Sequence, residues 1–173
     1  MKFVVFFLVV GVLGRVLVGM IGGGSDFEDR ATVTRAIDGD TVAVSIDGIG
    51  EDVRLVGVDT PESVRPGVPV ECGAEQASAS LHGLLPAGTI VRLKGDSHAD
   101  ERDRYGRLLA HVYVREGPSW REVELEQLRR GWATVYRFDG QSIDGGDRYD
   151  QAQLAAREND RGVWGLCSGD FHR

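Results

Sequence analysis

The chain has 173 residues, a length that suits one domain of ordinary size with a short tail. Its 27 acidic residues outnumber the 20 lysines and arginines, which gives a formal net charge of −7 at pH 7. This charge excludes a protein that holds nucleic acid by bulk positive charge, because such binding is driven by the counterions that neutralised phosphates release. A polyanionic ligand would need a local cluster of arginines and a bound cation to overcome the average field.

The N-terminal segment is an apolar run behind a single positive charge at Lys2. This pattern is typical of an export signal, and a cut after Gly24 would remove residues 1–24. No A-x-A motif precedes that position, so an uncleaved membrane anchor through residues 3–24 is the alternative. We therefore expect a secreted or cell-surface protein. Residues 25–30 are polar and are expected to form a short linker.

Two cysteines, Cys72 and Cys167, follow the export segment. In an oxidising compartment two cysteines most economically form one disulfide, which we predict here. Two buried free thiols are the alternative. The loop closed by this bond would be long, and the chain-entropy model gives a stabilisation of at most about 4–5 kcal/mol.

Alternating or β-branched residues predict two strands at the start of the domain, over 32–37 and 41–46. The dipeptide Asp47-Gly48 follows the second strand and is a strong signal for a tight β-hairpin. A third strand is expected over 53–58. Together the three strands are expected to form an antiparallel meander.

The segment 63–71 contains two prolines and a glycine without periodicity, which predicts a loop that we consider a candidate flap. Residues 74–85 carry apolar side chains at helical spacing and end at Pro86, so a helix is expected there. The remaining predicted elements are a strand over 89–94, a charged loop over 95–104, a strand over 108–114, a helix over 122–130, a polar loop over 139–146 and a helix over 147–160.

These five strands and three helices do not alternate regularly. The pattern predicts a mixed α+β domain whose sheet closes into a small barrel. We expect the domain to span residues 31–168, with residues 169–173 as a tail.

Acidic residues gather around the second and third predicted strands, where they can offer oxygen ligands to a hard cation and activate a water molecule. A strand-borne arginine, Arg54, lies among them. Regular pleating would point Arg54 and Asp59 to opposite faces, because they are an odd number of residues apart. Their convergence requires a twist or bulge, which we expect at Gly57. The acidic residues are Asp38, Asp40, Asp59 and Glu62.

Six motifs occur in a specific order along the chain. They are Asp38-Gly39-Asp40-Thr41-Val42, Arg54-Leu55, Val58-Asp59-Thr60-Pro61-Glu62, Asp103-Arg104-Tyr105-Gly106-Arg107, Gly131-Trp132-Ala133 and Gly162-Val163-Trp164. In this order they resemble the staphylococcal nuclease (thermonuclease-like) family over roughly residues 31–165. The resemblance implies a five-stranded OB-type β-barrel with three α-helices, and calcium-dependent hydrolysis of DNA and RNA that leaves 3′-phosphate ends.

The resemblance also implies a set of ligands for Ca²⁺. It assigns the carboxylates of Asp40 and Asp59 and the backbone carbonyl of Thr60 to the ion. Hard oxygen ligands suit a hard cation that keeps several waters and room for a phosphate oxygen. On the same resemblance Glu62 is the general base. Considered alone, Asp38 and Asp40 are alternatively turn residues, since Asp-Gly favours tight turns.

Substrate contacts are implied for several further residues. Arg54 and Arg107 would bind the phosphate and stabilise the charge that grows in the five-coordinate transition state. Tyr105 and Tyr136 can stack on an unpaired base, although packing at the barrel edge explains them equally well. Arg104 is a further candidate beside Tyr105.

Other titratable residues show no pattern of function. The four histidines have no metal-ligand spacing, and the aspartates of 139–150 lack a calcium-loop pattern, so we expect a solvated loop there. Two residues depart from the family, since Glu124 replaces a usual asparagine and Gln127 a usual apolar residue.

The sequence therefore predicts a secreted or surface-anchored, monomeric, calcium-dependent nuclease for DNA and RNA. We expect a preference for single strands, because an unpaired base most easily reaches a shallow barrel groove. The alternative is a non-catalytic nucleic-acid-binding OB-fold module, and a structural or adhesion domain is a third interpretation. The presence of every expected site residue argues against both alternatives. These residues are Asp40, Arg54, Asp59, Glu62 and Arg107.

Overall fold

The computed structural model describes residues 29–63 and 69–170. Several expected segments lie wholly or partly outside the described residues, namely the signal or anchor (1–24), residues 25–28 of the linker, 64–68 of the candidate flap and 171–173 of the tail. The first strand begins at Asp29, so the last two residues of the expected linker belong to it. In the described part of the chain, no helix has the length and apolar character needed to cross a membrane.

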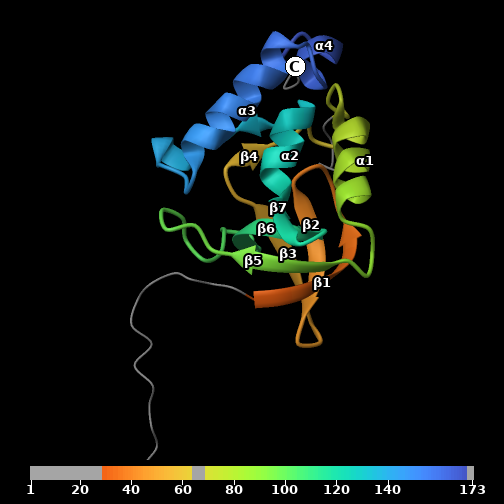
Figure 1. Ribbon diagram of the computed structural model, residues 1–173, viewed down its shortest axis with the longest axis vertical. Helices are drawn as coiled ribbons and strands as arrows, with labels where there is room; N and C mark the ends of the chain where they lie inside the picture. Colours follow the sequence, from red (N-terminus) through yellow and green to blue (C-terminus); the bar gives the residue numbers. More distant parts are fainter. Residues whose placement is uncertain (1–28, 64–68, 171–173) are drawn as a thin grey trace, which may run out of the picture.

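Five strands close into a barrel (Figure 1). The strands are β1 (Asp29–Ala36), β2 (Thr41–Ile46), β3 (Ile49–Leu55), β5 (Ile90–Lys94) and β6 (Leu108–Glu116). Neighbouring strands pair antiparallel in the order β3-β2-β1-β5-β6, and a parallel pairing of β3 with β6 joins the two edges. A sixth strand, β7 (Ser119–Glu122), extends the sheet beyond β6. Closure and the added helices confirm the predicted α+β, OB-type fold.

The hairpin between β2 and β3 has the predicted two-residue turn. Ile46 pairs with Ile49, and both turn residues have positive φ, 49° at Asp47 and 86° at Gly48. Positive φ at both positions defines the turn type whose twist matches that of the flanking strands. The hairpin therefore places β3 directly beside β2 for its whole length.

The expected continuous strand over 53–58 is wrong. β3 starts earlier, at Ile49, and ends at Leu55, and a turn at Val56 and Gly57 separates it from a two-residue strand, β4 (Val58–Asp59). Gly57 has φ 78°, a left-handed conformation that a regular strand does not contain. β4 leaves the barrel and pairs with β8 (Thr134–Val135).

Three α-helices lie close to their predicted positions. They are α1 (Ala74–Leu84), α2 (Val123–Arg130) and α3 (Gly146–Glu158). Figure 1 shows them gathered on one side of the barrel, where α2 contacts β6, α1 and α3. Two short helices were not predicted, the 3₁₀ turn η1 (Phe138–Gly140) and α4 (Val163–Leu166). The predicted disulfide between Cys72 and Cys167 is present.

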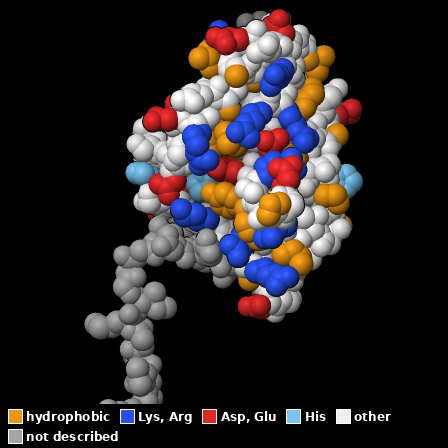
Figure 2. Space-filling view, viewed as in Figure 1, with side chains coloured by type: hydrophobic (Ala, Val, Ile, Leu, Met, Phe, Trp, Pro, Cys, Tyr) orange, Lys and Arg blue, Asp and Glu red, His pale blue; other side chains and the backbone are white. Residues whose placement is uncertain are grey.

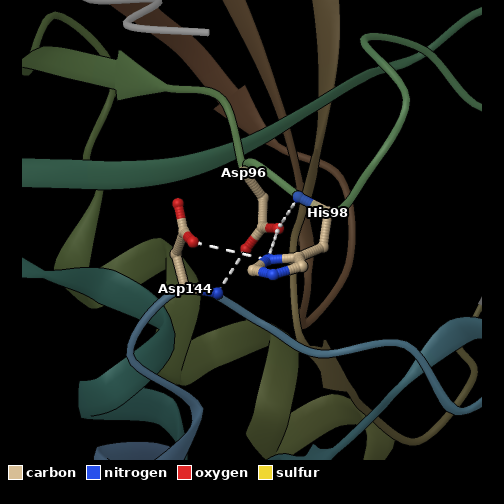
Figure 3. A group of neighbouring side chains, drawn as sticks. All are labelled: Asp96, His98 and Asp144. Carbon is tan, nitrogen blue, oxygen red and sulfur yellow. Dashed lines mark hydrogen bonds and ion pairs between the residues drawn. The ribbon is translucent and has the colours of Figure 1, made fainter. Parts of the chain in front are cut away.

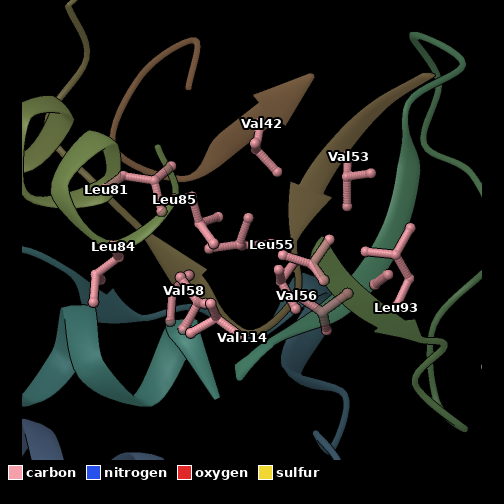
Figure 4. Close-up of a cluster of buried hydrophobic side chains, with 14 of the residues drawn as sticks. Val42, Val53, Leu55, Val56, Val58, Leu81, Leu84, Leu85, Leu93 and Val114 are labelled. Atoms are coloured by element: carbon pink, nitrogen blue, oxygen red, sulfur yellow. The ribbon is translucent and has the colours of Figure 1, made fainter. Parts of the chain in front are cut away.

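The core fills the barrel and continues under the helices (Figure 4). Alternate residues of β2 and β3 point inward, among them Val42, Val53 and Leu55, which are at most 1% exposed. Leu81 and Leu85 at the end of α1 close one side of this cluster. Burial of each such side chain stabilises the fold by about 1.5–3 kcal/mol, so the core holds the site-bearing loops on a rigid support.

Candidate active site

A pocket of about 150 Å³ opens where the β1–β2 connection, β3 and the segment after β4 meet. All but one of its lining residues are polar or charged. Seven of them lie before residue 63, in the first three motifs of the family resemblance. The eighth is Arg107, which precedes β6. The lining residues are Asp38, Asp40, Arg54, Asp59, Thr60, Pro61, Glu62 and Arg107.

Asp40 is the most deeply buried carboxylate of the pocket, with 6% of the residue exposed. Its Oδ1 accepts a hydrogen bond from the Thr41 hydroxyl at 3.1 Å. Its Oδ2 accepts one from the Thr60 backbone N–H at 3.0 Å and one from the Thr60 hydroxyl at 2.8 Å. These contacts tie the start of β2 to the segment after β4 and fix the orientation of the carboxylate.

Arg54 joins the two sides of the turn at Gly57. One terminal nitrogen donates to the carbonyl oxygens of Leu55 and Val58, each at 2.8 Å. The other donates to Asp59 Oδ1 at 3.1 Å, and Nε lies 3.2 Å from Asp40 Oδ1. The turn therefore brings Arg54 and Asp59 together, as the parity of their positions required.

Asp38 adds a third carboxylate at this edge of the pocket. Its Oδ1 accepts a hydrogen bond from the Asp40 backbone N–H at 3.0 Å. Burial, followed by the negative charge of Asp40, raises the pKa of Asp38 to about 6. The pocket thus concentrates more negative charge than Arg54 alone offsets.

The donor set fits a hard divalent cation. Asp40 and Asp59 present carboxylate oxygens, and Thr60 follows Asp59 directly in the chain. Asp38 adds further negative charge beside Asp40. Hard oxygen donors and excess negative charge are what Ca²⁺ binds. A cation here would offset the repulsion between Asp38 and Asp40.

Glu62 is positioned by its backbone. Its N–H donates to Glu71 Oε2 at 2.7 Å, and the Glu71 N–H donates to the Glu62 carbonyl at 3.1 Å. Pro61 precedes it and fixes the local φ. The half-buried carboxylate lies in the same pocket as Asp40 and Arg107.

Arg107 is held by a residue to which sequence analysis assigned no role. Asp103 Oδ2 lies 2.7 Å from both Nε and a terminal nitrogen of Arg107, and Asp103 Oδ1 accepts the Arg107 N–H at 3.0 Å. The guanidinium also donates to the Thr41 hydroxyl at 3.4 Å. Asp103 and Arg107 are four positions apart in one sequence motif, and this spacing could have indicated the contact.

The remaining predicted contact residues lie outside this pocket. Tyr105, with 69% of its surface exposed, lines a second pocket of about 310 Å³ that shares Arg107 with the first. The Arg104 guanidinium lies 4.8 Å over the Tyr105 ring and donates to its hydroxyl. Tyr136 is exposed and lines neither pocket, although its N–H donates to the Gly57 carbonyl.

Comparison with known proteins identifies relatives of the whole domain. The family described as staphylococcal nuclease homologue matches residues 52–165, a range that includes Arg54, Asp59, Glu62 and Arg107 but begins after Asp38 and Asp40. A thermonuclease of Staphylococcus hyicus is 35% identical over 137 residues, covering 79% of this chain and 76% of that protein.

Two further relatives are longer proteins. The endonuclease YncB of Bacillus subtilis is 41% identical over 115 residues, which is 66% of this chain and 53% of YncB. The probable endonuclease LCL3 of Schizophyllum commune is 33% identical over 123 residues, 65% of this chain and 39% of LCL3. The matched family range, the coverage of the thermonuclease and the barrel lead to one conclusion: this chain belongs to the staphylococcal nuclease family.

Proposed function

We propose that the protein is a calcium-dependent endonuclease that hydrolyses phosphodiester bonds of DNA and RNA. The observation that carries the proposal is the meeting of acidic, basic and oxygen-rich groups in one pocket of about 150 Å³. The relatives named thermonuclease and endonuclease support the same reaction class. The ion would be held by the carboxylates of Asp40 and Asp59 and by Thr60.

Each group of the pocket has a separate role in the proposed reaction. Glu62 accepts a proton from the attacking water as the general base. Arg54 and Arg107 bind the non-bridging phosphate oxygens and stabilise the additional negative charge of the transition state. Asp103 keeps the Arg107 guanidinium directed toward the pocket through its two 2.7 Å contacts. A bound Ca²⁺ would supply further neutralisation of phosphate charge.

We further propose a preference for unpaired strands. Tyr105 is exposed beside the second pocket and close to Arg107, so a base can stack near it while its phosphate reaches the first pocket. The Arg104 guanidinium covers part of that ring and adds a positive group. Secretion or surface attachment is also proposed, because the apolar run of residues 3–24 and the disulfide both suit an exported protein.

Cleavage assays on single-stranded DNA and RNA test the function. The purified protein should cut both with millimolar Ca²⁺ and stop when a chelator is added. Glu62→Gln should lower the turnover by about 10²–10⁴-fold, because it removes the base without changing the shape of the side chain. Glu75→Gln removes the same charge from an exposed position on α1 and serves as the control.

The assay also separates the proposed enzyme from a binding module. Binding of single-stranded DNA without cleavage, under Ca²⁺ and every other divalent cation, would replace the proposal with the nucleic-acid-binding function. Full activity of Glu62→Gln would retain the nuclease but remove Glu62 from its mechanism.

A further inference from the structure

Three side chains of types that bind metal ions meet where the loop between β5 and β6 lies beside the segment before α3 (Figure 3). None of them lines the pocket described above. Asp96 and His98 lie in the loop between β5 and β6, and Asp144 precedes α3. One ligand atom from each lies within 4.8 Å of the other two. No sequence pattern predicts this group, because Asp144 is distant in the chain and the histidine spacing is not that of a known metal motif.

The distances within the group suit a tetrahedral metal better than a hydrogen bond. His98 Nδ1 lies 3.5 Å from Asp96 Oδ1 and 3.5 Å from Asp144 Oδ1. This exceeds the 2.7–3.2 Å of an N–H···O hydrogen bond. Zinc–nitrogen and zinc–oxygen bonds of about 2.0–2.2 Å place tetrahedral ligands about 3.3–3.5 Å apart. The imidazole nitrogen therefore faces two carboxylate oxygens at a spacing that a metal cation can bridge.

Groups outside the cluster hold Asp96 in place. Its Oδ2 lies 3.0 Å from His111 Nε2, and the other ring nitrogen of His111 lies 2.9 Å from the Tyr149 hydroxyl. This chain of contacts is buried and belongs to the barrel and α3. Hydrogen bonds of this kind orient carboxylates that act as metal ligands in proteins. Asp96 is therefore fixed before any ion arrives.

The other two ligands leave the group open to solvent. The side chains of His98 and Asp144 are 46% and 32% exposed, against 1% for Asp96. Ser97 donates to both Asp144 oxygens, at 2.7 Å from its hydroxyl and 3.2 Å from its N–H. The Ser97 hydroxyl also lies 3.1 Å from His98 Nδ1, a contact that a metal would displace. Water can complete the coordination from the exposed side.

We propose that Asp96, His98 and Asp144 bind one divalent transition-metal ion, for which Zn²⁺ is the best chemical match. One imidazole and two carboxylates suit Zn²⁺, whereas Ca²⁺ and Mg²⁺ prefer oxygen donors alone. The ion joins the β5–β6 loop, which continues to Asp103 and Arg107, to the segment that starts α3. This site is separate from the calcium pocket and stands whether or not the protein is a nuclease.

Cobalt(II) is the direct test, because tetrahedral Co²⁺ with an imidazole ligand absorbs visible light far more strongly than octahedral, oxygen-bound Co²⁺. The protein without a polyhistidine tag is titrated with Co²⁺ in millimolar Ca²⁺, which occupies the oxygen-only pocket. We expect strong visible bands that saturate at one equivalent and disappear when Zn²⁺ is added. His98→Ala and Asp144→Asn should each weaken Co²⁺ and Zn²⁺ binding at least tenfold.

His82→Ala on α1 is the matched control, since it removes an exposed histidine outside the cluster and should leave both affinities unchanged. Zn²⁺ at a hundredfold excess over its Kd should raise the melting temperature of the wild type by about 5–10 °C, and that of His98→Ala by at most about half as much. Equal Zn²⁺ affinity in wild type and His98→Ala, or only weak octahedral Co²⁺ bands, would overturn the proposal. Metal-free melting curves check that the variants are folded. We expect them to be folded, because both substituted side chains are partly exposed.

Discussion

The Asp40 carboxylate lies at the centre of the candidate active site and accepts contacts from four donors. Three are hydrogen bonds from Thr41 and Thr60, and the fourth is the ion pair with Arg54. Only a carboxylate accepts at all of these positions, because an amide replaces one oxygen by a donor. Asp40 therefore contributes to the local structure as well as to the proposed metal set.

Asp40→Asn should lower both the stability of the fold and the affinity for Ca²⁺. One Thr60 or Thr41 donor would face an NH₂ group, and the negative charge that attracts the cation would be lost. We expect Ca²⁺ affinity to fall at least tenfold and the free energy of unfolding to fall by about 1–3 kcal/mol. Calorimetric Ca²⁺ titration and urea unfolding measure the two effects.

Asp52→Asn is the control for Asp40→Asn, because it removes the same charge from an exposed position on β3. Its Ca²⁺ affinity should stay within about twofold of the wild type. Glu62→Gln provides the converse comparison, with turnover lost and Ca²⁺ affinity kept. A loss of affinity in Glu62→Gln equal to that in Asp40→Asn would show that Glu62 belongs to the metal set.

Glu124 is a fully buried carboxyl group in the interior between α2 and β6. Its Oε1 accepts the Val112 N–H at 2.8 Å, while its Oε2 has no hydrogen-bond partner among the residues that the structure describes. Burial, together with the charge of Glu122, raises the pKa of Glu124 well above the ordinary glutamate value of 4.5. The raised pKa favours the neutral form of this carboxyl group in the folded protein.

Glu124→Gln should become more stable than the wild type as pH rises. Above pH 4.5 the unfolded wild type releases this proton while the folded protein keeps it, so the raised pKa makes stability fall with increasing pH. Glutamine has no proton to lose. The difference in unfolding free energy should widen by about 1.4 kcal/mol per pH unit up to the folded-state pKa. Urea unfolding at pH 5, 6, 7 and 8 measures it, and parallel pH curves would mean that Glu124 is ionised in the fold.

At the scale of elements, the break between β3 and β4 creates the site. A continuous strand would place Arg54 and Asp59 on opposite faces. The turn at Val56 and Gly57 reverses that parity, and Arg54 then closes the turn by donating to the carbonyls of Leu55 and Val58. The barrel positions the strand that carries Arg54, and the turn brings Arg54 and Asp59 into contact.

Gly57→Ala should be more damaging than Gly48→Ala, although both glycines have φ near +80°. A Cβ at position 57 would lie 2.8 Å from the Tyr149 ring and 3.0 Å from Ile143, whereas position 48 has nothing within 4 Å. Left-handed strain alone costs about 1–2 kcal/mol, and overpacking adds about 1–3 kcal/mol. Urea unfolding should show this difference, and cleavage activity should fall only in Gly57→Ala. Equal losses would assign the cost to backbone strain alone.

Local patterns in the sequence predicted the elements that local forces determine. The Asp47-Gly48 turn, the three main helices and the barrel strands follow from turn residues and periodicity. β4, β8 and α4 were missed because two-residue ladders and single helical turns form only where tertiary pairing supports them. The contacts between Asp96, His111 and Tyr149 were missed for the same reason, since these residues come from three separate segments.

The candidate site was the easier part to predict, because most of its members lie close together in the chain. The loop between β1 and β2, the end of β3 and the segment after β4 are consecutive or nearly so. Arg107 required the motif that contains it, since nothing local places it beside Thr41. The ion pair between Asp103 and Arg107 was recognised only in the structure.

At the scale of the whole molecule, charge is distributed unevenly. The chain carries a net −7, yet lysine and arginine side chains gather down the middle of the face shown in Figure 2. Within the candidate site, Arg54 and Arg107 are the positive members among four carboxylates. Binding of a polyanion should therefore depend on a few local contacts and on the cation, so its salt dependence should be shallow.

The disulfide joins the approach to α1 with the end of α4. Cys72 lies two residues before α1, and Cys167 follows α4, at a sequence separation of 95. Neither cysteine lines the candidate pocket. The bond therefore affects the unfolded chain and the C-terminal helices more than it affects the catalytic groups.

Removal of this bond should lower stability and spare activity at low temperature. Without the cross-link the unfolded chain gains the entropy of a long open loop, at most about 4–5 kcal/mol, which corresponds to a melting temperature lower by about 10–15 °C. A Cys72→Ala/Cys167→Ala double variant should have the same melting temperature as the reduced wild type. Added reductant should lower the melting temperature of the wild type alone. At 25 °C, where both forms remain folded, cleavage rates should agree within about twofold. A double variant that melts with the oxidised wild type would show that the cross-link does not limit the unfolded state, and a large loss of activity at 25 °C would show that α4 and the start of α1 hold the site.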